Sequence, residues 1–394
     1  MNIIDWTLYI PLALSVCYLF VYAVASKFYR APHFPEANKL RRFVVLFPAY
    51  KEDKVIIQSI EDFLQQDYPK ELFDIIVISD KMQDITNDIL RSLPIRLLIA
   101  NYSDSSKAKA MTLAMKSINS DLYDITVVMD ADNLTSKNFL AEINRAFENG
   151  AESIQAHRTG KDFNTDISML DCISEEINNG IFRSGHNALG LSAALSGSGM
   201  AFDAKWFNNN VAHLQTAGED KELETLLLLQ GVHTTYLSQL PVYDEKTHKK
   251  EAIKNQRKRW IAAQFGALRS SSQNFIKSLR SGNIDYCDKI LQWMLPPRLI
   301  QIFTIFIFTL LFTSISIWQS LQSGGCEWMS SLKWWILSIL QATSMIIPIP
   351  KSFFNKRLGR AILRIPMLAV DTLRSLFKLK GINKKFIHTE HGEQ

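Results

Sequence analysis

The chain has 394 residues, which is enough for one large domain or two domains of ordinary size. Its formal net charge of +5 and its 47% hydrophobic content are ordinary, and no internal repeat or low-complexity tract is visible. Basic residues are concentrated beside apolar stretches and between Lys246 and Arg269, without a nucleic-acid-binding module. The composition therefore argues against a nucleic-acid partner and favours anionic lipid headgroups or a nucleotide diphosphate.

Three stretches without charged residues, at 6–26, 299–325 and 334–350, predict transmembrane helices. The third is shorter and closed by prolines, so the last two stretches alternatively form a re-entrant hairpin. Lys and Arg cluster at 27–42 and 351–360, and Arg298 precedes the second stretch. By the positive-inside rule, we expect a multi-pass protein of the inner or plasma membrane with its central block in the cytoplasm.

The predicted organisation has five parts. They are an anchor at 1–30, a cytoplasmic α/β domain at 31–283, an interfacial helix at 284–298, two membrane helices within 299–350, and a cytoplasmic helix and tail at 351–394. The last of these contains too many charges to span a bilayer easily, so we expect it to lie along the membrane surface.

Within the central block, apolar strands at 43–47, 73–78, 95–99 and 125–133 alternate with helical patterns from Val55, over 107–117 and from Ser136. This alternation predicts a doubly wound, mostly parallel sheet. Asp130 and Asp132 end the fourth strand, and ligands of such sheets bind beyond the carboxyl ends of the strands. Two carboxylates there are suited to Mg²⁺ or Mn²⁺ carrying a diphosphate, although a solvated turn is the simpler alternative.

Beyond this strand the pattern is less regular. We expect a strand at 153–156, a helix at 167–182, a glycine-containing segment at 195–202, a helix opening at 218–224, and a helix around 256–260. On that last helix, Gln256, Arg259 and Trp260 share one face.

Seven short motifs occur in order along this block. They are P-A-Y-x-E at 48–52, Asp80, K-A-K-A-M-T at 107–112, D-A-D at 130–132, G-S-G-M-A-F at 197–202, G-E-D at 218–220 and Q-R-K-R-W at 256–260. Over residues 43–260 this set closely resembles the membrane-bound family 2 glycosyltransferases, which have a GT-A fold and include the cellulose, chitin and hyaluronan synthases.

The resemblance implies a role for each motif. The nucleotide would be bound by Ala49, Tyr50, Glu52, Asp80, Lys107, Asp130, Gln256, Arg259 and Trp260; the metal by Asp130 and Asp132; and the acceptor by Gly197, Ser198, Gly199, Met200 and Trp260. Asp220 of the E-D pair would be the catalytic base, beside Glu219. The chain departs from the family pattern at Lys51, where asparagine is common, and at Ser106 and Thr112 around the lysine motif.

The implied activity is an inverting transfer of a hexose from a UDP-sugar to a growing polysaccharide, and the complete Q-x-x-R-W favours processive addition. A second hypothesis is the transfer of one sugar to a lipid-linked acceptor. A third is a non-catalytic membrane protein that binds nucleotide sugars. His248 is a further possible metal ligand. The partners we expect are a UDP-sugar, a glycan or lipid-linked acceptor, and membrane lipids.

Overall fold

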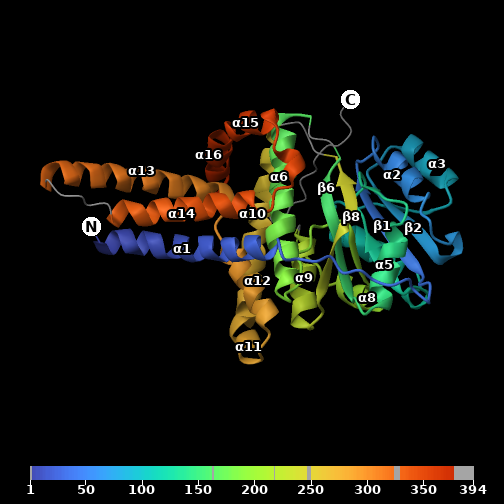
Figure 1. Ribbon diagram of the computed structural model, residues 1–394. Helices are drawn as coiled ribbons and strands as arrows, with labels where there is room; N and C mark the ends of the chain where they lie inside the picture. The colour runs from blue at the N-terminus through green and yellow to red at the C-terminus, as the bar shows by residue number, and fades with distance from the viewer. Residues whose placement is uncertain (1, 162–163, 217, 246–249, 324–328, 377–394) are drawn as a thin grey trace.

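The computed structural model describes residues 2–161, 164–216, 218–245, 250–323 and 329–376. Figure 1 shows an α/β region on one side and three long helices that extend side by side from the other. Between them lie the helices that carry part of the candidate site (Figure 1).

The sheet has eight strands in the order β3-β2-β1-β4-β7-β6-β8-β5. They are β1 (Phe43–Tyr50), β2 (Phe73–Asp80), β3 (Arg96–Ala100), β4 (Ile125–Val128), β5 (Leu134–Thr135), β6 (Ser153–Gly160), β7 (Met200–Asp203) and β8 (Thr234–Asp244). The first four strands are parallel, as are β6 and β8, whereas β7 is antiparallel to both β4 and β6, and β5 to β8. The predicted mostly parallel sheet is confirmed. The sequence pattern did not show that β7 and β5 run antiparallel to their neighbours.

Helices cover both faces of this sheet. Along β1, Phe43, Val45 and Phe47 face one side, Val44 and Leu46 face the other, and all five are fully buried. The first side is covered by α2 (Ile56–Phe63), α3 (Asp84–Ser92) and α5 (Phe139–Glu148), and the second by α4 (Lys107–Lys116), α8 (Ala204–Val211) and α9 (Glu219–Leu229). Burial on both faces explains why the central strands appear in the sequence as unbroken apolar runs.

The run predicted as one strand over 125–133 is shorter in the structure. β4 ends at Val128, and the N–H of Asp130 donates to the side chains of Asn133 and Ser198, at 3.0 Å each. These side chains replace a neighbouring strand as the hydrogen-bonding partner, so the chain leaves the sheet. Asp130 and Asp132 therefore lie in a turn beyond the strand rather than on alternate strand positions.

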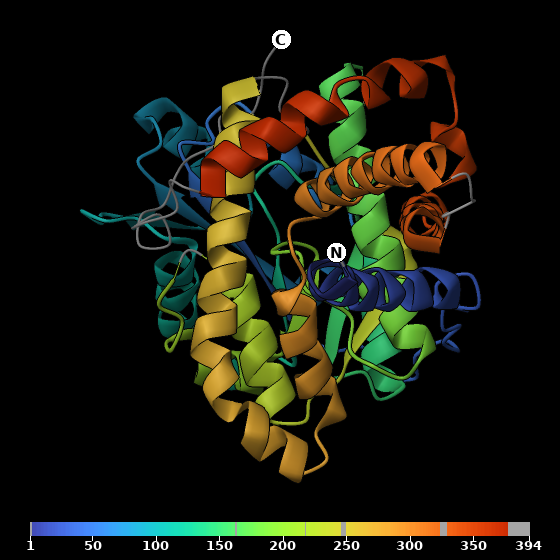
Figure 2. The same ribbon diagram turned by 90° about the vertical axis from the view of Figure 1, so that its left-hand side faces the viewer.

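The second half of the chain is mostly helical. Helix α6 (Asp166–Asn178) runs directly into a π-helix, η3 (Asn179–Gly185), and then into α7 (His186–Ala188). Later, α10 (Lys250–Ser271) and α12 (Ile284–Met294) pack side by side against α9, with α11 (Phe275–Arg280) between them in sequence (Figure 2).

Three helices, α1 (Asn2–Ala25), α13 (Arg298–Ser323) and α14 (Met329–Ile346), form what we call the helical bundle (Figure 1). Its interior is filled by fully or nearly fully buried side chains, namely those of Val16, Ile305, Phe312, Trp334 and Leu337. The rings of Phe312 and Trp334 stack with centroids 5.3 Å apart.

Glycines let the bundle pack closely on η3. A Cβ atom at Gly185 would lie 2.2 Å from the carbonyl oxygen of Tyr22 in α1, and one at Gly180 would lie 2.3 Å from Cβ of Pro348. Because the first obstacle is backbone, α1 would have to move to accept any side chain at position 185. The π-helix is thus a docking surface for the bundle.

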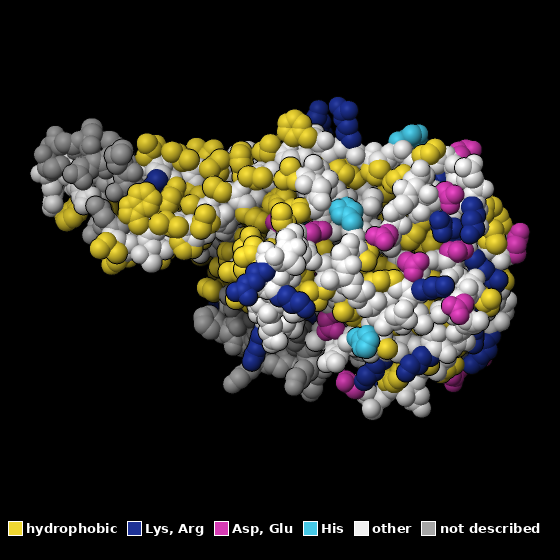
Figure 3. All heavy atoms as spheres, turned by 90° about the horizontal axis from the view of Figure 1, so that it is seen from below, with side chains coloured by type: hydrophobic (Ala, Val, Ile, Leu, Met, Phe, Trp, Pro, Cys, Tyr) yellow, Lys and Arg dark blue, Asp and Glu magenta, His cyan; other side chains and the backbone are white. Residues whose placement is uncertain are grey.

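Among the described helices, two are long and apolar enough to cross a membrane, over Ile3–Ala25 and Arg298–Gln322. Helix α14, which corresponds to the predicted third span, is not one of these two and ends at Ile346. On the face seen in Figure 3, the bundle is nevertheless predominantly apolar, whereas charged side chains are spread over the α/β region. Helices α15 (Lys356–Ile362) and α16 (Ile365–Leu376) follow where the predicted surface helix lies.

Candidate active site

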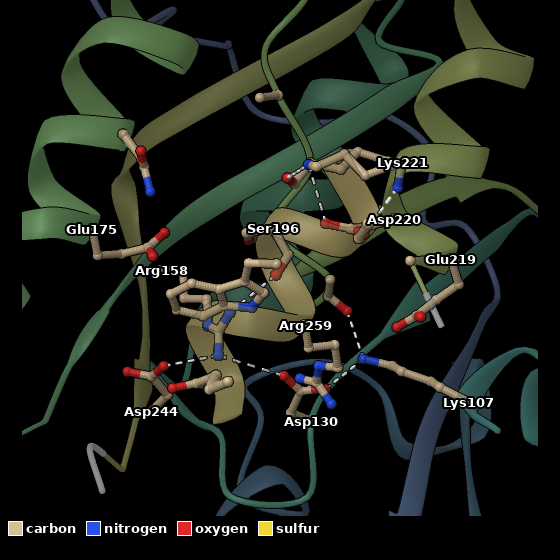
Figure 4. A pocket seen from close by; sticks show the side chains of 18 of the residues that line it. Lys107, Asp130, Arg158, Glu175, Ser196, Glu219, Asp220, Lys221, Asp244 and Arg259 are labelled. Atoms are coloured by element: carbon tan, nitrogen blue, oxygen red, sulfur yellow. Dashed lines mark hydrogen bonds and ion pairs between the residues drawn. The ribbon is translucent and has the colours of Figure 1, made fainter. Parts of the chain in front are cut away.

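A cavity of about 390 Å³ opens beyond the carboxyl ends of β1, β2 and β4. Its wall includes most of the residues singled out from the sequence: Ala49, Tyr50, Glu52, Asp80, Lys107, Asp130, Asp132, Gly197, Glu219, Asp220, Gln256, Arg259 and Trp260. Segments as far apart in the sequence as Ala49 and Trp260 thus meet at one place, and several of them are visible in Figure 4.

Three residues predicted to bind the acceptor lie behind this wall. Met200 is fully buried in the sheet, and Ser198 is fully buried with its hydroxyl held by Asn133 and the N–H of Asp130. Gly199 has a positive φ of 62°, and a Cβ there would lie 2.9 Å from the side chain of Val242. Of these three residues, Ser198 supports the turn that carries the two aspartates, and of the four residues at 197–200 only Gly197 lines the cavity.

One end of the cavity is formed where β1 and β2 end in register, with Tyr50 opposite Asp80. Asp80 is 3% exposed, and its Oδ1 has no hydrogen-bond partner within the described residues. A buried acceptor without a donor is costly unless a ligand supplies one. Asp80 therefore suits an N–H group of a nucleobase.

Two lysines next to these strand ends have strained backbones. Lys51 and Lys81 both have φ of 56°, which is uncommon for residues other than glycine. Their ammonium groups lie 5.6 and 5.4 Å from the centroid of the Tyr50 ring, within the range of cation–π attraction. Lys81 was not recognised from the sequence, and the only signal for Lys51 was that it replaces the usual asparagine.

Asp130 lies between two cations. Its Oδ1 accepts a hydrogen bond from Lys107, and its Oδ2 lies 3.7 Å from Nη2 of Arg158 (Figure 4). Arg158 also pairs with Asp244 at 2.9 Å and donates to the carbonyl of Ser196 at 3.0 Å. Burial alone would lower the pKa of Arg158, but Asp244 and Asp130 raise it well above its usual value. Arg158 and Asp244 belong to no motif that the sequence revealed.

The carboxylates of Asp130 and Asp132 both face the cavity and can hold a divalent cation, with the remaining ligands coming from a diphosphate and water. Asp132 is oriented by the N–H of Glu245, 3.1 Å from its Oδ2. Within the described part of the chain, no cluster of three or more His, Cys, Asp or Glu side chains surrounds such a position. His248 lies outside the described residues.

The E-D pair occupies the first turn of α9, where backbone N–H groups favour negative charge. The turn is held close to α10, because a Cβ at Gly218 would lie 2.8 Å from that of Ala263. Burial and the neighbouring Asp220 raise the pKa of Glu219 to about 7, against the opposing effect of Lys107. The two acids therefore differ in environment although they are adjacent in sequence.

The raised pKa of Glu219 predicts a pH-dependent stability. The pKa of Glu219 is about 7 in the folded protein, against 4.5 for the free side chain, so the unfolded chain releases this proton first as the pH rises. Wild type should lose stability between pH 4.5 and 7 relative to Glu219→Gln, by about 3 kcal/mol. Thermal unfolding of both proteins across this pH range would measure the difference, and parallel pH curves would contradict it.

Lys221 connects the proposed base to the acceptor side of the cavity. Its ammonium lies 3.2 Å from Oδ2 of Asp220 and 3.3 Å from Oε2 of the buried Glu224 (Figure 4). Oε1 of Glu224 accepts the N–H of Leu195 at 2.7 Å and lies 3.4 Å from Nζ of the fully buried Lys289. Burial would lower the pKa of Lys221, but Asp220 and Glu224 raise it well above its usual value.

We expect Lys221→Met to lower kcat about tenfold to a hundredfold, because Asp220 would lose the cation that lies 3.2 Å from its Oδ2 and orients its carboxylate. Lys221→Arg should restore part of the rate, which a purely structural defect would not explain. The control is Lys109→Met on α4, where the side chain is 48% exposed. A wild-type kcat in Lys221→Met would refute this role.

Gln256, Arg259 and Trp260 of α10 reach the same cavity from the side opposite the sheet. Arg259 acts electrostatically on Glu219, and Trp260 is 38% exposed. An aromatic face in a cavity lined by carboxylates is a suitable surface for a sugar ring. A doubly wound sheet with acids at its strand ends and this helix above them defines a GT-A-type glycosyltransferase.

Residues 41–263 match the family model described as "Glycosyltransferase like family 2". This segment is more than half of the chain, and the protein belongs to that family.

Two curated relatives share part of the sequence. The chain is 32% identical over 105 residues to the probable glycosyltransferase YdaM of Bacillus subtilis, covering 25% of each protein. It is 28% identical over 86 residues to the dolichyl N-acetyl-alpha-D-glucosaminyl phosphate 3-beta-D-2,3-diacetamido-2,3-dideoxy-beta-D-glucuronosyltransferase of Methanococcus voltae, covering 21% of this chain and 27% of that protein. The matches thus span about a quarter of each relative's length.

A solved structure extends the similarity in fold. The mannosyltransferase of Pyrobaculum calidifontis, in complex with GDP-Man and Mn²⁺, superimposes with a TM-score of 0.53 over 93% of this chain and 99% of its own. At 13% sequence identity this likeness concerns the fold alone.

Proposed function

We propose that the protein transfers a sugar, with inversion, from a UDP-sugar to an acceptor hydroxyl in this cavity. The observation that carries the proposal is the meeting of Asp80, Asp130, Asp132 and Asp220 around one space. The four carboxylates serve three parts of the proposed reaction: Asp80 the base, Asp130 and Asp132 the diphosphate, and Asp220 the acceptor hydroxyl.

The residues at the end of the cavity next to β1 and β2 suit a nucleoside diphosphate as the donor. The unpartnered Oδ1 of Asp80 can accept the N3–H of uracil, and the Tyr50 ring lies beside it at the paired strand end. Lys107 and Arg259, which line the cavity near Asp130 and Glu219, offer positive charge to the two phosphates. Because a guanine N–H could also meet Asp80, the choice of base is part of the test below.

Asp130 and Asp132 would hold Mg²⁺ or Mn²⁺, which when bound neutralises the charge that develops on the diphosphate. The protein's own contribution is to hold the turn that carries them: Asn133 and Ser198 accept from the N–H of Asp130, and the N–H of Glu245 donates to Oδ2 of Asp132.

The step itself is a displacement at the anomeric carbon. The acceptor oxygen bonds to C1 as the bond from C1 to the diphosphate oxygen breaks, and Asp220 takes the hydroxyl proton. The leaving UDP keeps the electron pair, and Arg259 lies near enough to the acids of α9 to share its negative charge. A single displacement inverts the configuration, so an α-linked donor gives a β-linked product.

A membrane location is supported by the end of the helical bundle that lies far from the sheet. At the end far from the sheet, Asp5 is paired with Lys333 and accepts from Nε1 of Trp334 at 2.9 Å, so both charges are neutralised. Trp6, Trp318 and Trp335 on the bundle are about half exposed, and tryptophan is enriched at membrane interfaces. We place the α/β domain on the cytoplasmic side, where nucleotide sugars are available.

The packing inside the helical bundle also indicates which kind of acceptor the protein uses. Its interior is filled by Val16, Phe312, Trp334 and their neighbours, so the described helices of one chain enclose no path for a polymer. This observation favours transfer of a single sugar to a lipid-linked acceptor over processive synthesis with translocation. The name of the Methanococcus voltae relative, which includes a dolichyl phosphate sugar, is consistent with this choice.

The test is to incubate the purified full-length protein in nanodiscs with a panel of UDP- and GDP-sugars, Mg²⁺ or Mn²⁺, and a lipid extract. Nucleoside diphosphate release identifies the donor, and mass spectrometry sizes the product. We expect release from one UDP-sugar and a lipid that has gained a single sugar. A long polymer would overturn the acceptor assignment, and preference for GDP-sugars would overturn the donor assignment.

A further inference from the structure

We propose that Arg298, with Arg257 close by, forms a binding site for the phosphate that joins the acceptor to its lipid. The site lies where the cavity meets the helical bundle and is distinct from the diphosphate position at Asp130. This inference rests on the proposed function, because it assigns the part of the acceptor that the transfer step does not touch.

Arg298 is the first residue of α13 and lines the cavity. Its Nη2 donates to Oγ of Ser174 at 2.9 Å, which fixes the guanidinium, while its Nη1 is buried without a hydrogen-bond partner among the described residues. A buried N–H of a permanently charged group is costly to leave unpaired. An anion entering the cavity would supply the missing acceptor.

A second guanidinium strengthens the positive charge. Arg257, within the Q-R-K-R-W motif, lies close enough to repel Arg298. Its Nη1 is likewise buried without a partner in the described structure, and burial lowers its pKa against the opposing effect of Asp171. An anion would relieve both the repulsion and the poor solvation.

Two carboxylates act on these guanidinium groups. Asp171 acts on Arg257, and Glu175 acts on Arg298. Glu175 also accepts a hydrogen bond from Nη1 of Arg183 at 2.8 Å. The carboxylate that acts on Arg298 is therefore shared with another arginine.

The walls around Arg298 are apolar. They are formed by Leu19 of α1, Phe182 of η3, and Leu295, Pro296 and Pro297 before α13. The Gln292 amide, whose Oε1 is buried without a partner within the described residues, also lines this end. An anion beside apolar walls and two candidate membrane helices matches a phosphate with a hydrocarbon chain on one side and a sugar on the other.

The probe is farnesyl diphosphate. Farnesol, which has only the hydrocarbon part, and inorganic pyrophosphate, which has only the anionic part, are the control compounds. Binding to full-length protein in neutral-lipid nanodiscs is measured with saturating UDP and Mn²⁺, so that the donor position is already filled. We expect farnesyl diphosphate to bind at least about tenfold more tightly than either control compound.

Arg298→Gln should weaken farnesyl diphosphate binding about tenfold and Arg298→Lys should weaken it less, while UDP binding stays unchanged in both. The matched control is Arg360→Gln, which removes an exposed positive charge from α15 beside the same membrane surface. Retained UDP binding shows that the variant is folded.

Unchanged farnesyl diphosphate binding in Arg298→Gln would overturn the inference. Pyrophosphate binding as tightly as farnesyl diphosphate would show a site for free phosphate instead. Displacement of the probe when phosphatidylglycerol is added to the nanodisc would show a site for bulk lipid headgroups. None of these results depends on sugar transfer, so failure of this inference is distinguishable from failure of the proposed function.

Discussion

Asp220→Asn is expected to lower kcat by about 10³-fold, because the acceptor hydroxyl would lose the group that takes its proton. The amide is nearly the same size as the carboxylate and can still accept from the N–H of Lys221, which lies 2.9 Å from Oδ1. The turn at the start of α9 should therefore keep its shape. UDP binding, measured by calorimetry, should change by less than about threefold.

The control for this variant is Asp84→Asn, which removes an exposed acid from the first turn of α3. It should leave both kcat and UDP affinity unchanged. Transfer by Asp220→Asn at the wild-type rate would remove Asp220 from the mechanism. If Glu219→Gln alone abolished transfer, the proton-accepting role would belong to Glu219.

The second large effect is expected from Asp132→Asn. One of two carboxylates offered to the metal would be lost, and we expect kcat/KM for the donor to fall by about 10³-fold, or roughly 4 kcal/mol of transition-state stabilisation. The side-chain oxygen that remains can still accept the N–H of Glu245, so the local turn should persist. A metal titration should show that far more Mn²⁺ is needed for half-maximal rate.

Asp132 is a cleaner test of metal binding than Asp130. Replacing Asp130 would also leave Lys107 and Arg158 without their shared carboxylate, and an uncompensated buried charge destabilises the fold. Binding of UDP without metal should be the same in Asp132→Asn and wild type. A variant that responds to Mn²⁺ like wild type would exclude Asp132 as a ligand.

Parts of the candidate site follow from local patterns. Asp80 and Asp130 follow apolar runs, and parallel strands end at the same edge of a sheet, so their proximity could be predicted before the structure. Gln256, Arg259 and Trp260 could be placed on one helical face from their spacing alone. Neither prediction required knowledge of how distant segments pack.

Other parts could not be predicted in this way. Arg158 belongs to a strand whose sequence contains no distinctive motif, yet it contacts Asp130 because β6 is separated from β4 only by β7. The docking of α1 on η3 depends on Gly185, which in the sequence is one glycine among sixteen. The positions of Ser198 and Met200 behind the cavity wall follow from the reversed direction of β7, which the prediction of parallel strands did not include.

The sequence by itself determined the alternation of strands and helices, the acids at the strand ends and the apolar helices, because each of these is written in the periodicity and composition of neighbouring residues. Only the tertiary structure decided which cation faces which carboxylate, as with Lys221 and Asp220 or Arg158 and Asp130, and which buried N–H groups remain without an acceptor, as at Arg298. The physical reason is that burial and charge pairing depend on segments brought together by packing across long sequence separations, and such contacts have no local signal.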